Sequence, residues 1–76
     1  PNPVTDNHIN IQYRLPEKTT GKVEIYDLPG HQLHHLILIE GIGNSDLDLS
    51  DLPKGLYIYT ITINNEPYKI DKLIVE

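Results

Sequence analysis

Residues 56–63 read Leu-Tyr-Ile-Tyr-Thr-Ile-Thr-Ile, and this stretch sets the fold class. Each residue is leucine, aromatic or β-branched, the types that fit a pleated and partly buried surface. Apolar side chains alternate onto both faces, which predicts a strand that lies centrally in a sheet. Asn64-Asn65 follows where a two-residue hairpin loop belongs, because asparagine tolerates the positive φ of such turns. The sequence therefore predicts a β-hairpin that begins with this strand.

Residues 66–75 are predicted to return beside this strand as the last one of the sheet. A tight hairpin predicts two opposed pairs, Ile61 with Tyr68 and Tyr59 with Ile70. Pro67 has no N–H group to donate to a ladder of hydrogen bonds. Its side of the last strand is therefore expected to be an edge or an interrupted stretch.

Four further strands are predicted upstream, at residues 8–15, 22–28, 32–40 and 46–50. In the first of them, apolar residues alternate with polar ones at Ile9, Ile11, Tyr13 and Leu15. The segment 32–40 also fits a helical spacing, but its length and its run of branched apolar residues favour a strand. Residues 40–45 contain two glycines and are expected to form a flexible loop.

Two proline–glycine turns separate these strands. Leu28-Pro29-Gly30-His31 has proline second and glycine third, which indicates a type II turn because glycine accepts positive φ. Leu52-Pro53-Lys54-Gly55 has proline second and glycine last, which indicates a type I turn. The predicted structural turn residues are therefore Pro29, Gly30, Pro53 and Gly55.

Length and composition make an all-β domain the economical solution for this chain. The 76 residues include no Ala, Met, Trp, Phe or Cys, so good helix formers are scarce and Ile, Leu, Val and Tyr must supply the core. Six strands are predicted, or seven if the segment around Val4 pairs. We expect a small immunoglobulin-like antiparallel β-sandwich, a single domain over residues 1–76 that is excised from a longer chain.

The same composition excludes several classes of function. Without cysteine the chain has no disulfide, no thiolate metal site and no cysteine nucleophile. Eleven acidic residues against six basic ones give a net charge of −5, which argues against a nucleic-acid surface. No apolar run approaches the roughly 18 residues that a membrane-spanning helix needs.

The clustered histidines are a candidate metal site without the required pattern. His34 and His35 point to opposite faces of a strand, so they and His31 do not supply the three or four converging ligands of a zinc site. A Ser–His–Asp arrangement could be drawn on paper from Ser50, but there is no nucleophile elbow and no Gly-rich phosphate loop. We therefore expect surface histidines and no catalytic residue.

The acidic run is the second candidate metal site. Asp46, Asp48 and Asp51, with Glu40 nearby, could meet a hard cation such as Ca²⁺. The spacing of an EF-hand loop is absent. A solvated strand face whose charges discourage edge pairing is the favoured interpretation.

Tyr57 is a candidate structural residue. It follows the Pro53–Gly55 turn and opens the central strand, as does the tyrosine of a tyrosine corner in Greek-key sandwiches. In that arrangement the hydroxyl group donates to an upstream backbone carbonyl. The alternative is an ordinary core tyrosine with its hydroxyl at the rim.

Four short segments stand out in order along the chain. They are Pro1-Asn2-Pro3-Val4 with Ile9-x-Ile11, Val23 to Gly30, Leu49 to Tyr57, and Lys72 to Glu76. Together they resemble the C-terminal sorting domain carried by cargo proteins of the bacterial type IX secretion system. The third contains Gly55-x-Tyr57, the most recognisable element of that family, and the fourth resembles its closing lysine-plus-apolar tail. The loop 40–45 and the three histidines have no counterpart in the family pattern.

The resemblance implies an address tag rather than an enzyme, with no catalytic residue, metal or cofactor. An N-terminal signal takes the cargo to the periplasm, and the outer-membrane translocon then recognises the tag and delivers the cargo to the cell surface or medium. In many family members a sortase-like protease removes the tag, which here implies cleavage upstream of Pro1. The implied partners are the translocon, the protease and the linked N-terminal cargo, and neither nucleic acid nor a small molecule. The isolated domain is expected to be a monomer or weak dimer.

The resemblance also assigns recognition to seven residues: Gly55, Tyr57, Lys72, Leu73, Ile74, Val75 and Glu76. A terminal strand can dock by strand addition while its side chains supply specificity. The competing class is a non-catalytic immunoglobulin- or fibronectin-like module that spaces domains or binds carbohydrate. It would need Tyr57, Tyr59 and Tyr68 to form a flat exposed row.

Overall fold

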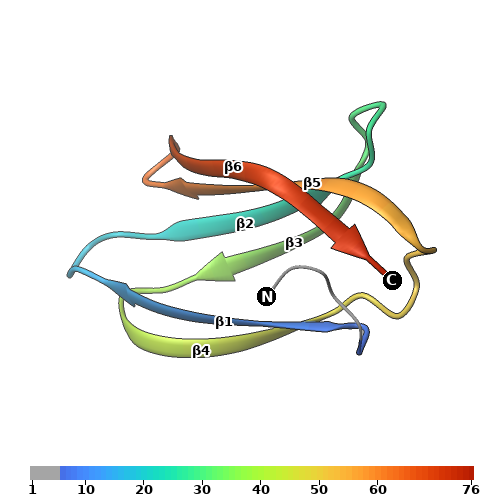
Figure 1. The fold of residues 1–76 in the computed structure, drawn as a ribbon. Coiled ribbons are helices and arrows are strands. Elements are labelled where there is room, and N and C mark those ends of the chain that lie inside the picture. The colour runs from blue at the N-terminus through green and yellow to red at the C-terminus, as the bar shows by residue number, and fades with distance from the viewer. Residues whose placement is uncertain (1–5) are drawn as a thin grey trace.

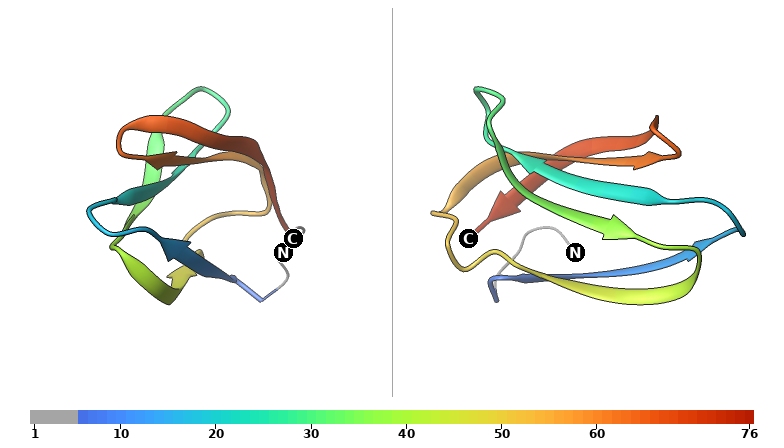
Figure 2. Two further views of the ribbon diagram at one scale, coloured as in Figure 1. Left: turned by 90° about the vertical axis from the view of Figure 1, so that its left-hand side faces the viewer. Right: turned by 180° about the vertical axis from the view of Figure 1, so that it is seen from behind.

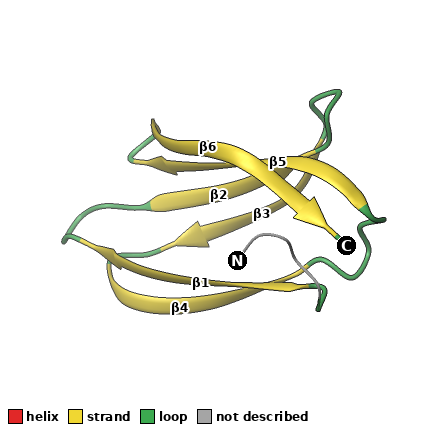
Figure 3. Cartoon of the chain, viewed as in Figure 1, coloured by secondary structure: helices red, strands yellow, loops and turns green. Residues whose placement is uncertain are grey.

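The computed structural model describes residues 6–76, which form six strands and no helix (Figures 1 and 3). The strands are β1 His8–Leu15, β2 Gly21–Tyr26, β3 Gln32–Leu38, β4 Gly41–Asp48, β5 Gly55–Ile63 and β6 Glu66–Val75. Five of the six predicted strands are confirmed, including β3, which also fitted a helical spacing, whereas the strand predicted at residues 46–50 is displaced and runs from Gly41 to Asp48. A seventh strand around Val4 would lie outside the described residues. Residues 6–76 contain no helix that is long and apolar enough to span a membrane.

The strands form two antiparallel sheets that face each other (Figure 2). The larger sheet has the order β3-β2-β5-β6, and the smaller sheet pairs β1 with β4. β5 therefore lies between β2 and β6, in the central position that its two apolar faces predicted. The predicted small antiparallel β-sandwich is confirmed.

The core lies between the two sheets. Its most buried side chains are Ile25, Leu49 and Val23, each at most 1% exposed. The main cluster contains Ile25 and Leu49 together with Ile9 and Leu47 of the smaller sheet, Tyr57, Leu73 and Val75 of the larger sheet, and Leu52 from the turn before β5. A smaller cluster of Leu15, Val23 and Leu38 continues it. Side chains alternate along a strand, so the residues next to these core residues in the strands lie on the outer face of each sheet.

The expectation of a flexible loop at residues 40–45 is wrong, because β4 already begins at Gly41. Gly43 lies opposite Tyr13 of β1, and a Cβ atom on Gly43 would overlap the Tyr13 ring. The glycine thus makes room for a cross-strand aromatic ring rather than for a loop. Local sequence shows the glycine but not the ring that lies over it.

The two cross-strand pairs predicted for the last hairpin are also wrong. Asn64 and Asn65 do have the predicted positive φ values, 51° and 65°. However, the β5–β6 ladder shifts between Ile61 and Thr62, so Ile61 lies opposite Lys69 instead of Tyr68. The predicted interruption near Pro67 is therefore confirmed, and it inserts one extra residue into β6. A shift of one residue moves every later side chain to the other face.

The hydrogen-bonded turn before β5 begins earlier than predicted. The Leu52 N–H donates to the Leu49 carbonyl at 2.9 Å, so this turn precedes Pro53 instead of starting at Leu52. Leu49 and Leu52 are both buried in the core. Their burial fixes the chain on either side of the turn, and the residues from Pro53 to Gly55 lead into β5.

Candidate functional site

The two most characteristic segments of the chain form one antiparallel ribbon. The register of β5 and β6 places Gly55 opposite Val75, Leu56 opposite Ile74, and Tyr57 opposite Leu73. The Gly55-x-Tyr57 element and the closing tail are therefore direct neighbours, although they are separated in the sequence (Figure 1). We call this pair of segments, residues 55–58 and 72–76, the terminal ribbon. All seven recognition residues expected from the sequence lie in it.

The inner side of the terminal ribbon belongs to the core. Tyr57 is 8% exposed, and Leu73 and Val75 are each 3% exposed. The Tyr57 hydroxyl donates to the Pro53 carbonyl at 2.6 Å, which confirms the predicted tyrosine corner. The bond satisfies the one polar group that this ring carries into the core. These three side chains hold the ribbon in place and are not open to a partner.

Gly55 has no close packing partner. A Cβ atom at this position would have only the Tyr57 ring within 4 Å, at 3.9 Å. Packing alone therefore does not exclude a side chain at Gly55.

The outer side of the terminal ribbon faces solvent. Leu56 is 42% exposed and Ile74, directly opposite, is 39% exposed. Lys72 lies opposite Ile58 on the same side, and Lys72 and Glu76 are both exposed. The expected recognition set thus divides into a buried half and an exposed half.

The sequence missed the residues that extend this outer side. Ile70 and Tyr68 of β6 are 73% and 69% exposed, and Leu56 and Ile58 complete the row on β5. The apolar residues on both faces of β5 were a signal for Leu56 and Ile58. Ile70 could not be placed from sequence, because the interruption near Pro67 changes its face.

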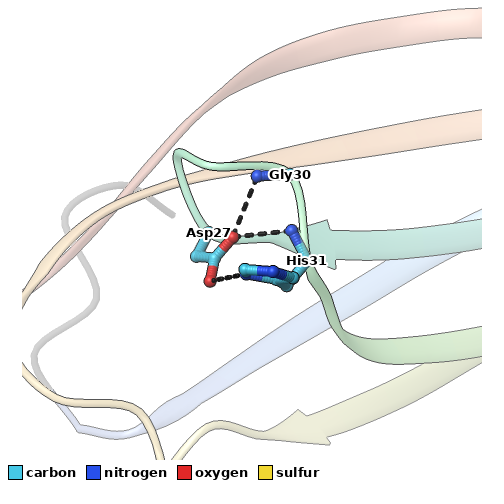
Figure 4. Close-up of polar contacts among 3 residues, drawn as sticks. All are labelled: Asp27, Gly30 and His31. Atoms are coloured by element: carbon cyan, nitrogen blue, oxygen red, sulfur yellow. Dashed lines mark hydrogen bonds and ion pairs between the residues drawn. The ribbon is translucent and has the colours of Figure 1, made fainter.

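The turn between β2 and β3 is organised by Asp27 (Figure 4). One carboxylate oxygen, Oδ1, accepts the N–H groups of Gly30 at 3.0 Å and His31 at 2.7 Å, and Oδ2 lies 3.0 Å from His31 Nδ1. Gly30 N–H also donates to the Asp27 carbonyl, so the turn starts one residue before the predicted type II turn. Gly30 has the predicted positive φ, 104°. This carboxylate therefore anchors both Gly30 and the first of the three histidines.

These contacts set the ionisation of Asp27. Desolvation is the largest single effect and raises the pKa of Asp27. The hydrogen bonds from the His31 backbone and ring and from Gly30 lower it, and their combined effect is larger than that of desolvation. The net result is an Asp27 pKa below its ordinary value. His31 is thereby engaged in the turn and does not converge with His34 or His35.

The other candidate metal ligands are also distributed among separate contacts. His34 Nε2 lies 2.8 Å from the Asp51 carboxylate, and Asp48 accepts the Ser50 N–H at 2.8 Å. Asp46 accepts a hydrogen bond from the Asn10 amide. Within residues 6–76, no three histidine, aspartate or glutamate side chains gather into a group that could hold a metal ion.

The tyrosines do not form the flat row that a carbohydrate platform needs. Tyr57 is buried and Tyr59 is half-buried against the core, whereas Tyr68 is exposed at the interruption of β6. The Lys69 ammonium lies 5.8 Å from the centre of the Tyr59 ring, and its contacts with Tyr59 raise the pKa of Lys69. Tyr59 thus has an intramolecular partner over its ring.

An open groove runs between the two sheets beside β1 and β6. Its apolar lining comes from Ile9, Ile11, Val23, Tyr59, Ile61 and Leu73. Asn10, Gln12 and Lys69 supply the polar lining. Lys69 and Tyr59 are the two ionisable side chains in this lining, and they lie against each other.

Comparison with known proteins gives one match over the whole chain. The model of a family described as the secretion system C-terminal sorting domain matches residues 1–76. No curated protein and no solved structure matches the chain. The family match covers both strands of the terminal ribbon.

Proposed function

The chain belongs to the family of secretion system C-terminal sorting domains, and from this premise we propose that the terminal ribbon is the part that the type IX secretion machinery reads. The family supports a sorting signal at the C-terminus of a cargo protein that is secreted or displayed at the cell surface. The domain would act as an address and not as a catalyst. It would carry its cargo across the outer membrane through contacts made by its surface.

The observation that carries this proposal is the register of β5 and β6. It joins the Gly55-x-Tyr57 element to the closing tail in one ribbon, so a single partner surface can contact both. Lys72, Ile74 and Glu76 present their exposed side chains on this ribbon. Leu73, Val75 and Tyr57 would contribute by holding the ribbon in shape.

The proposed partners follow from this role. The outer-membrane translocon would bind the folded tag, and a sortase-like protease would cleave upstream of Pro1 after export. The linked N-terminal cargo would then remain at the cell surface or enter the medium. The domain needs no cofactor for these steps, because it supplies only a surface.

A secretion assay tests the proposal. Residues 1–76 are fused behind a fluorescent reporter that is exported to the periplasm of a host with the type IX machinery. We expect the reporter outside the cell only when both the domain and the machinery are present. Retention of the intact fusion in the periplasm would overturn the proposal.

The tail needs a substitution that leaves the core intact. Deleting residues 72–76 removes Leu73 and Val75 from the core, so it would block export by unfolding the domain even if no partner reads the tail. Lys72→Gln changes an exposed side chain of the terminal ribbon, and Lys18→Gln, between β1 and β2, is the matched control. Reduced export of the Lys72→Gln fusion alone would support reading of the ribbon, and equal export of both would remove Lys72 from it.

A further inference from the structure

The outer side of β5 and β6 carries more apolar surface than the fold requires. Its most exposed members are Ile70 at 73%, Tyr68 at 69%, Leu56 at 42% and Ile74 at 39%. We call these four residues, together with Ile58 and Lys72, the β5–β6 face. No element formed by residues 6–76 lies over it (Figure 2).

These side chains are contiguous on the sheet. Leu56 lies directly opposite Ile74, and Ile58 lies opposite Lys72. Ile70 is two residues before Lys72 and therefore lies on the same side of β6, since side chains alternate along a strand. The result is an apolar strip with one lysine in its middle.

The outer side of the other sheet shows that such a strip is not needed for folding. There β1 and β4 present polar pairs, with His8 opposite Asp48, Asn10 opposite Asp46 and Gln12 opposite Asn44. Its one large apolar side chain is Ile42, which is 77% exposed and lies opposite Arg14. A contiguous exposed apolar patch with polar surroundings is typical of a protein interaction site.

Charge indicates what kind of partner fits the strip. Lys72 is its cation, and Lys22 lies on the same side of the sheet two strands away. Glu24 lies beside Lys22 on the same strand; its carboxylate is 4.0 Å from the Lys22 ammonium and accepts the Tyr26 hydroxyl at 2.7 Å, a bond that raises the pKa of Tyr26. A partner surface with an apolar stripe and a carboxylate opposite Lys72 would complement both properties.

The same charges argue against two other occupants. An anionic membrane would repel a domain of net charge −5 that offers one lysine within its apolar strip. A second copy packed about a two-fold axis through the strip would bring Lys72 close to the Lys72 of its partner. A protein of different sequence avoids both conflicts.

We propose that the β5–β6 face is the docking surface for a protein of the secretion machinery that presents an apolar stripe with a carboxylate facing Lys72. This rests on the proposed function, because the face is continuous with the terminal ribbon through Leu56, Ile74 and Lys72. It extends that site to Ile70 and Tyr68, which lie outside the segments that define the family pattern. The docking surface is therefore a sheet face, and the tail is one end of it.

The decisive variant is Ile70→Glu, with Ile42→Glu as its matched control. Both place a carboxylate on an exposed isoleucine of a strand, at 73% and 77% exposure, but on opposite sheets. In the reporter fusion, Ile70→Glu should reduce the exported fraction by about tenfold or more, because a carboxylate would be buried against the apolar stripe of the partner. Ile42→Glu should leave export unchanged. Thermal unfolding of both variants, followed by circular dichroism, checks that each remains folded.

The outcomes separate this inference from the proposed function. If the intact fusion is exported and Ile70→Glu is exported equally well, the docking face is wrong while the sorting function stands. If the intact fusion stays in the periplasm, the sorting function itself fails. A dimer that sedimentation detects in the intact domain but not in Ile70→Glu would overturn the proposed partner in favour of a second copy. Flotation of the domain with vesicles of phosphatidylethanolamine and phosphatidylglycerol would overturn it in favour of a lipid surface.

Discussion

The strand pairs β1–β4 and β5–β6 are built alike on the inside and differently on the outside. Each pair turns an apolar row toward the core, Ile9 and Leu47 in one and Leu73 and Val75 in the other. Outside, β1–β4 carries a mostly polar row, whereas β5–β6 carries the apolar strip around Lys72. Folding explains both inner rows, because burying apolar surface is the main stabilising term.

The outer rows teach a different lesson. A strand with one face in water ordinarily alternates apolar and polar residues, as β1 does. β5 and β6 depart from that alternation at Leu56, Ile70 and Ile74, where exposed apolar side chains add nothing to the core. This difference between the pairs is the observation from which we propose that the outer side of β5–β6 contacts another protein.

The largest expected effect compares the two sides of β6. Leu73→Ala should lower the free energy of unfolding by about 2–5 kcal/mol, because it leaves a cavity in the core. Ile74→Ala, one residue later on the outer side, should cost less than about 1 kcal/mol. Urea unfolding followed by circular dichroism measures both, and equal losses would mean that the assigned sides of β6 are wrong.

The next effect tests the inner side of β1–β4. Gly43→Ala should destabilise the domain by about 1–3 kcal/mol, because the new Cβ atom overlaps the Tyr13 ring. In a Tyr13→Ala background the same substitution should cost little. A double-mutant cycle measures the coupling, and its absence would show that the ring does not lie over the glycine.

A smaller effect compares two tyrosines. Tyr57→Phe should cost about 1 kcal/mol, since it removes the hydrogen bond to the Pro53 carbonyl inside the core. Tyr68→Phe, on the exposed side of β6, should leave the unfolding midpoint unchanged. The prediction fails if the two substitutions shift the midpoint equally.

The smallest expected effect concerns the polar outer row of β4. The hydrogen bonds from the Ser50 backbone and side chain, with a smaller attraction from His8 and His34, hold the pKa of Asp48 below its ordinary value of 3.8. The ionised form is therefore favoured by folding, so its stabilisation is present above about pH 4 and is lost as the pH falls through the lowered pKa. Asp48→Asn should flatten the acid side of the stability–pH curve measured by urea unfolding. An unchanged curve would contradict this role of Asp48.

Much of the fold could be predicted because its signals are local. Alternation located the strands, Asn64-Asn65 located the last hairpin, and Tyr57 after Pro53 located the tyrosine corner. Both proline–glycine turns were displaced by local hydrogen bonds, whereas the failure at Gly43 depends on residues far apart in the sequence. Gly43 needs Tyr13, which lies 30 residues upstream, to be understood as part of a strand.

The candidate site was predicted as a list of residues but not as a surface. The sequence indicated Gly55, Tyr57 and the tail, and the register showed that they are neighbours. The sequence did not show that Leu73 and Val75 are buried, whereas Ile74 is exposed on the same side of the sheet as Leu56. Ile70 was assigned to the wrong pair, because one extra residue near Pro67 reverses the sides of the rest of β6.

The sequence by itself determined that this protein is an all-β domain with a sorting-domain pattern, since strand-forming residues, turns and short motifs are properties of neighbouring positions. Only the tertiary structure decided which side of each strand is buried, because that depends on the register of the ladder and on the second sheet. The same packing that hides Tyr57 and Leu73 leaves Leu56 and Ile74 exposed as one surface. Packing of the core thus determines which side chains remain exposed for a partner to contact.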